Sequence, residues 1–283
     1  MENFGDKLYN LVQNGRSRLF TQGEMSNLTY IAYERMISYI NEEEKETIPI
    51  SHPVGFTAEN KSIDSITDYT KEELIGRFQH LGLNRLPIDG IFKLVTIIEI
   101  LLSYILRDIL IEFPGKIPNK RKMDVEQALS ATSLEEIKIS IIDSLLNEMA
   151  YKSPRDYAEE FQKYTGINLL EFPVFHRYIE LKATRDIHIH NDGFANDIYI
   201  TKAATMARVK NGAFLPVDIQ YFLQSYEACL QLTEILENEL DKIWPSNDLR
   251  EYKKSRATQT ETEEKEEKID QVIEESKKKS KQN

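Results

Sequence analysis

The chain has 283 residues, of which 41% are hydrophobic and 29% charged, so it is long and apolar enough to bury a core. Its 36 basic and 47 acidic residues give a net charge of −11, which disfavours general coating of nucleic acid and means that a phosphate ligand needs a local basic patch. The single cysteine, Cys229, excludes a disulfide framework and cysteine-ligated zinc. Together with an amino-terminal stretch that lacks a secretion-signal pattern, it predicts a cytoplasmic protein.

The first part of the chain is predicted to be a helical extension, residues 1–66. Apolar residues at helical spacing predict a helix over 18–44. Residues 45–68 contain two prolines, Gly55 and several small polar residues, so this stretch is interpreted as a long connection. It is the best candidate for a domain boundary.

The middle of the chain, residues 67–248, is predicted to be an all-α, up-and-down helical bundle with short loops. Periodicity and capping signals predict helices over 70–81, 88–113, 134–151, 154–165, 173–190 and 216–243. Residues 91–113 of the second helix are as long as a membrane span but carry five charged side chains, so this helix is interpreted as the central buried helix, and no membrane segment is predicted. Residues 249–283 are highly charged and are predicted to form a disordered tail.

The stretch RDIHIHNDG, residues 185–193, holds the strongest chemical signal. Helix geometry places Arg185 on a buried stripe with His188 close to the same line, and places His190 four residues after Asp186. Asp186 is therefore expected to orient His190 or to raise its pKa. Two alternatives stay open at this point: Arg185 and His188 bind carbonyls at the helix end, or they take part in chemistry. A His-x-His metal pair is not expected, because the two rings diverge by about 200° on a helix.

The same residues resemble the motif of the HEPN superfamily, in which an arginine and a polar residue are followed, after three variable positions, by a histidine. The segments 93–110 and 152–166 are similar to the helices that precede the motif helix in that family. The resemblance covers about 175 residues, 70–245. It implies a helical bundle that works as a homodimer, with two motifs lining one cleft.

Many HEPN proteins are metal-independent endoribonucleases of toxin–antitoxin and antiviral defence systems, and others only bind ligands. The resemblance therefore predicts an RNA-cleaving toxin or defence effector, with an antitoxin or other regulatory protein as a possible partner. The alternative is a catalytically silent module that binds nucleotide, RNA or a protein. No metal or other cofactor is predicted, and no G-x-G pattern supports dinucleotide binding.

In this interpretation Arg185 binds the phosphate and His190 transfers protons. Asp186 orients His190, Asn191 positions the substrate or caps the helix, and His188 is the alternative to His190, because helix geometry alone pairs it with Arg185. In the middle of the long helix, Glu99 and Arg107 are interpreted as structural polar contacts. Four basic residues in the loop after that helix are candidates for holding the RNA backbone: Lys116, Lys120, Arg121 and Lys122.

Overall fold

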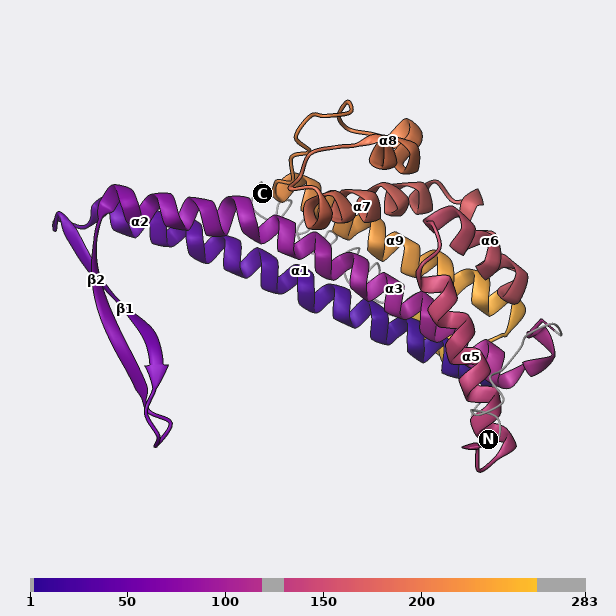
Figure 1. Ribbon diagram of the computed structural model, residues 1–283. Helices are drawn as coiled ribbons and strands as arrows, with labels where there is room; N and C mark the ends of the chain where they lie inside the picture. Colours follow the sequence, from indigo (N-terminus) through magenta and orange to yellow (C-terminus); the bar gives the residue numbers. More distant parts are fainter. Residues whose placement is uncertain (1–2, 119–129, 259–283) are drawn as a thin grey trace, which may run out of the picture. The chain divides into compact units, whose positions relative to one another are not determined.

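The computed structural model describes residues 3–118 and 130–258, and these are mostly helical with one small β-sheet (Figure 1). Two compact units are present: one combines the residues up to Gln13 with those from Ile235 onward, and the other is Asn14–Glu234. The predicted all-α class is therefore right for most of the described chain. The sheet is the exception.

The sheet lies in the segment that was expected to be a long connection. After α1 (Phe4–Glu42), β1 (Thr47–Phe56) and β2 (Ser62–Thr70) form an antiparallel hairpin. Its prolines do not prevent strand pairing, because in a two-stranded sheet every strand is an edge and one side of its backbone needs no partner. The register shifts between Pro53 and Gly55, at a bulge or irregularity beside the second proline.

The next helices run into one another without a loop. A capping box at Thr70 starts α2 (Lys71–Phe78), and a π-helical stretch (Gln79–Arg85) continues into α3 (Leu86–Glu112). The helix predicted over 70–81 was expected to end just before Gly82. Instead Gly82 is buried, and a Cβ there would collide with the ring of Tyr33 on α1, so its small size serves close helix contact.

Three helices follow the predicted bounds within one residue: α5 (Leu134–Ala150), α6 (Pro154–Thr165) and α7 (Pro173–His190). Each of the first two is preceded by a serine whose side chain accepts a hydrogen bond from a backbone N–H of the first turn. At the end of α6, Gly166 has φ 86°, the left-handed conformation that glycine adopts without a Cβ clash.

The long apolar helix α3 is central to the larger unit, as predicted. Its contacts include α5, α6 and α7. A Cβ on Gly15 of α1 would meet Leu101, and one on Gly90 would meet Phe222 of α9 (Ile219–Ile243), so α1 and α9 also lie against it. No helix in the described part of the chain is both long and apolar enough to cross a membrane.

The smaller unit is held by a few specific contacts. The rings of Phe4 and Trp244 meet edge to face at 5.8 Å. The carboxylate of Asp6 accepts hydrogen bonds from the Ser246 hydroxyl at 2.8 Å and from the backbone of the next residue at 2.6 Å. These bonds precede a helical segment at 247–258, in which Leu249 is buried. Up to residue 258, the disordered tail predicted from residue 249 is therefore helical instead. Residues 259–283 lie outside the described chain.

Candidate functional site

Helix α7 positions the residues of the predicted motif. It begins with Pro173 at its first turn and buries Val174, Tyr178 and Leu181 along one side. This is the stripe that the sequence predicted to lie in line with Arg185. Because α7 lies against α3, the next turn brings Arg185 to the middle of the long helix.

Arg185 belongs to a row of five alternating charges, the charge ladder: Lys182, Glu99, Arg185, Asp186 and Lys202. One oxygen of Glu99 binds Lys182 and the other lies 2.8 Å from Nη2 of Arg185. Nη1 of Arg185 is 3.0 Å from Asp186, whose second oxygen is 3.1 Å from Nζ of Lys202 on α8 (Asp197–Ala203). The ladder therefore ties α3, α7 and α8 together.

The ladder leaves Arg185 able to bind an anion. Three cations and two carboxylates give it a net charge of +1. The Arg185 side chain is 19% exposed, and each of its terminal nitrogens uses one hydrogen bond within the ladder. A guanidinium has five N–H donors, so three remain to bind phosphate oxygens.

Asp186 does not bind His190 in the structure. The expectation came from the spacing of four residues on one helix, but the Asp186 carboxylate lies between Arg185 and Lys202. Two permanent cations are stronger partners for a carboxylate than an exposed imidazole at the end of a helix. In this arrangement Asp186 orients Arg185.

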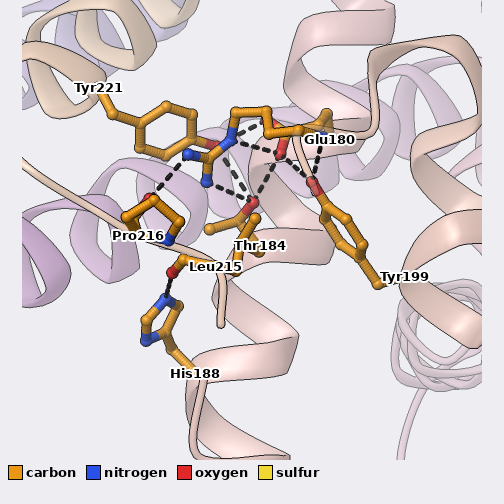
Figure 2. A network of polar contacts seen from close by, with 8 residues as sticks. Glu180, Thr184, His188, Tyr199, Leu215, Pro216 and Tyr221 are labelled. Carbon is orange, nitrogen blue, oxygen red and sulfur yellow. Dashed lines mark hydrogen bonds and ion pairs between the residues drawn. The ribbon is translucent and has the colours of Figure 1, made fainter. Parts of the chain in front are cut away.

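His188 contacts the segment at Phe214 and Leu215, which follows the motif in the sequence. Its Nε2 lies 2.9 Å from the carbonyl oxygen of Leu215, and since a carbonyl only accepts, this nitrogen carries the proton (Figure 2). Its ring meets Phe214 edge to face at 5.9 Å. Burial lowers the pKa of His188, and the charges of Arg208 and Arg85 lower it further against the opposing effect of the Leu215 hydrogen bond. His188 therefore has a structural contact with Leu215, and its burial favours the neutral form of the ring.

The turn after α7 is clamped to the same later segment. Gly193 has φ 81°, and a Cβ there would lie 2.6 Å from the Phe214 ring, so both conformation and space require glycine. The backbone of Gly193 accepts a 2.8 Å hydrogen bond from Leu215, and Phe194 pairs with Phe214 in an isolated β-bridge. Asn191 donates its side-chain amide to the carbonyl of Phe194, which assigns it to the turn. The predicted end of this helix at residue 190 is confirmed.

His190, the last residue of α7, is exposed. Within residues 3–118 and 130–258 its ring has no hydrogen bond or ion pair. Of the two motif histidines, His190 is therefore the one whose ring nitrogens are open to a ligand from solvent. It lies five residues after Arg185 at the end of the same helix.

A buried polar cluster supports this end of α7 one turn before the motif. The Glu180 cluster consists of Glu180, Thr184, Tyr199, Arg208 and Tyr221 (Figure 2). One carboxylate oxygen of Glu180 accepts from Thr184 at 2.7 Å, Tyr199 at 2.9 Å and Arg208 at 3.1 Å, and the other accepts from Tyr221 at 2.7 Å. The Glu180 side chain is 7% exposed, so it is a buried charge with four donors.

Arg208 links this cluster to the segment that holds His188. Its Nη1 donates to the carbonyl of Pro216 at 2.7 Å, and its guanidinium lies 3.6 Å from the centre of the Tyr221 ring. Its backbone N–H donates to the Tyr199 hydroxyl at 3.0 Å. Sequence reasoning missed the cluster. A glutamate among the buried positions of α7 was a usable signal, because a buried carboxylate needs a cation, but nothing in the pattern identified Arg208.

The other predicted residues are only partly described. Glu99 was interpreted as structural and forms the centre of the ladder, while Arg107 pairs with Asp143 of α5. Nζ of Lys116 donates to the carbonyl of Tyr164 at 2.7 Å, so its ammonium already has a partner in the fold. The remaining RNA-binding candidates, Lys120, Arg121 and Lys122, lie outside the described residues.

Within the described chain, no group of three or more His, Cys, Asp or Glu side chains is arranged to hold a metal ion. Comparisons with protein-family models, with curated proteins and with solved structures find no match to this chain. The charge ladder and the exposed His190 are thus the observations from which function is argued.

Proposed function

We propose that the chain is a metal-independent endoribonuclease of HEPN type, acting as a toxin or antiviral defence effector. The observation that carries this proposal is the placement of Arg185 and His190: one is fixed by two carboxylates with donors to spare, and the other is exposed without a partner in the described chain. These are the two kinds of group that cleavage of RNA by its own 2′-hydroxyl requires, a cation for the phosphate and histidines that carry protons.

The proposed reaction is an in-line attack on phosphorus. The 2′-oxygen bonds to the adjacent phosphorus while its proton passes to a neutral histidine, and the bond from phosphorus to the 5′-oxygen breaks as a protonated histidine donates to that oxygen. The products are a 2′,3′-cyclic phosphate and a 5′-hydroxyl. Arg185 binds the phosphoryl oxygens, whose negative charge grows in the transition state.

This reaction needs two proton carriers, and His188 is committed to Leu215. We therefore propose a symmetric homodimer of up-and-down helical bundles in which the second copy supplies the other His190. Light scattering at micromolar concentration tests the dimer. A monomer there contradicts the composite site.

The second candidate is a catalytically silent HEPN-like module that binds nucleotide, RNA or a protein partner. The engagement of Arg185 by Glu99 and Asp186 favours it, because an arginine held by two carboxylates serves a fold as well as a reaction. Binding of RNA that is left intact by pure protein would support this second function.

The deciding experiment is a panel of variants in an RNA cleavage assay. His190→Ala is expected to lose about 10²–10⁴-fold in rate as a lost general acid–base. Arg185→Lys is expected to lose on the order of 10²-fold, because an ammonium cannot grip two oxygens. The matched controls His80→Ala and Arg177→Lys change exposed residues and keep wild-type rates.

His188→Ala completes the panel, because it separates the two histidines. The cleavage rate of His188→Ala is expected to fall only as far as the variant loses fold stability. If His188→Ala is inactive while fully folded and His190→Ala is active, the assignment of the proton carrier is wrong. If His190→Ala and Arg185→Lys both cleave at wild-type rates, the proposed enzyme is wrong.

A further inference from the structure

A small pocket lies beside the charge ladder, with a volume of about 160 Å³. It is bounded by residues of α3, α5, α6 and α7, and most of its surface is apolar or aromatic: its walls include Leu102, Leu146, Pro154, Phe175 and Tyr178. A cavity of about 150 Å³ with apolar walls holds one benzene ring. The pocket therefore has room for a single six-membered ring.

One wall of the pocket carries an unused hydrogen-bonding group. The hydroxyl of Tyr157 on α6 is buried and has no hydrogen-bond partner among the described residues. Burial, followed by the nearby Glu99 carboxylate, raises the pKa of Tyr157, so the hydroxyl keeps its proton at neutral pH. A buried hydroxyl without a partner is unfavourable, and a ligand with an acceptor atom at this place relieves that cost.

The charged residues at the pocket neutralise one another. Glu99 and Lys182 line it and form an ion pair, and Lys152 pairs with Glu160 of α6 at 3.3 Å. A charged ligand would have to compete with these pairs. An uncharged ring that offers an acceptor to Tyr157 fits the apolar walls without disturbing them.

We propose that this pocket binds one uncharged, planar heteroaromatic ring of pyrimidine size, with an acceptor on its edge that takes a hydrogen bond from the Tyr157 hydroxyl. Glu99 lines the pocket and binds Arg185, so the ring lies next to the proposed phosphate-binding group. A base of the RNA strand and a free small molecule share this chemistry. Only the RNA source rests on the proposed function; the pocket itself does not.

The test uses the full chain and three probes: uracil, 2-pyridone and benzene. Uracil and 2-pyridone are expected to bind saturably at one site, measured by calorimetry or ligand-observed NMR. Tyr157→Phe keeps the shape and removes the donor, and is expected to weaken both by about 2–12-fold while leaving benzene unchanged. Tyr151→Phe, at a fully exposed tyrosine outside the pocket, is the matched control and keeps wild-type affinity.

A second variant blocks the pocket. Ala150→Phe adds a ring at an exposed rim position, the last residue of α5, and is expected to abolish binding of all three probes in protein that unfolds at the wild-type temperature. Absence of saturable binding to the wild type overturns the proposal. Binding that neither variant changes overturns it as well.

The RNA arm separates this inference from the proposed function. If the ring comes from RNA, one abasic position in an oligonucleotide weakens binding to the wild type, and Ala150→Phe removes that difference. If the free probes bind and the abasic position has no effect, the ligand is a free molecule. Ring binding without RNA cleavage supports the pocket and refutes the proposed enzyme. RNA cleavage without ring binding refutes only the pocket.

Discussion

Replacing Arg208 by alanine tests whether the Glu180 cluster holds the end of α7 in place. The change removes the only cation that contacts the buried Glu180 carboxylate among the described residues, together with the bond to the Pro216 carbonyl. Breaking a buried ion pair by removing one partner costs about 3–5 kcal/mol, because the other charge stays buried. The Arg208 side chain is 26% exposed and three hydroxyl donors remain on Glu180, which favours the lower end, about 3 kcal/mol.

The assay is urea unfolding of the full chain followed by circular dichroism, with thermal unfolding beside it. A loss of about 3 kcal/mol corresponds to a fall in Tm of roughly 6–12 °C for a unit of this size. Arg177→Ala, which truncates an exposed arginine of α7, is the control and is expected to stay within about 0.5 kcal/mol of the wild type.

A double-mutant cycle assigns the loss to the pair. Glu180→Gln and Arg208→Ala together are expected to cost less than the sum of the single changes, by at least about 1 kcal/mol, because each residue's main charged partner is the other. A loss below about 1 kcal/mol for Arg208→Ala, or additive single changes, would show that the cluster does not stabilise this end of α7.

Three further predictions follow from single sites. Burial lowers the pKa of His188, so the unfolded chain binds a proton at this ring more readily than the folded chain does. Acidification from about pH 6.5 down through the folded-state pKa therefore lowers the free energy of unfolding. His188→Gln should reduce the slope of that free energy against pH, and an unchanged slope would contradict this assignment. Ala204 has φ 50° and ψ −121°, a strained conformation for alanine, so Ala204→Gly should raise the free energy of unfolding by roughly 1 kcal/mol, whereas a loss would argue against strain. Burial raises the pKa of Cys229 to about 12, so iodoacetamide should label it only at the rate of unfolding; rapid labelling of native protein would contradict its burial.

Local signals in the sequence predicted the helices well. Ser153, Pro154 and Gly166 mark both ends of α6, and each acts through backbone groups within a few residues, so no knowledge of the fold is needed to interpret them. Gly193 likewise marks the end of α7 through a backbone hydrogen bond to a residue nearby in the chain. The hairpin at 47–70 was missed because its prolines lie in edge strands, where they are tolerated.

The site was predicted only where it depends on local geometry within one helix. The buried stripe of α7 and the position of Arg185 on it follow from helix geometry alone. Its partners do not: Glu99 is 86 residues away, and Arg208 is 28 residues from Glu180. The expected pairing of Asp186 with His190 failed because Lys202 reaches Asp186 from another helix. Spacing along one helix describes which contacts are possible, and packing of other elements decides which of them form.

The central claim, cleavage of RNA by its own 2′-hydroxyl without a metal, is tested most directly by the ends of the products. Purified wild-type protein is incubated with RNA in excess EDTA, and the fragment ends are identified by mass spectrometry. The account predicts fragments with 2′,3′-cyclic phosphate and 5′-hydroxyl ends, formed at the same rate as without EDTA. Intact RNA in EDTA with cleavage restored by a divalent ion, or fragments with 3′-hydroxyl and 5′-phosphate ends, would contradict it.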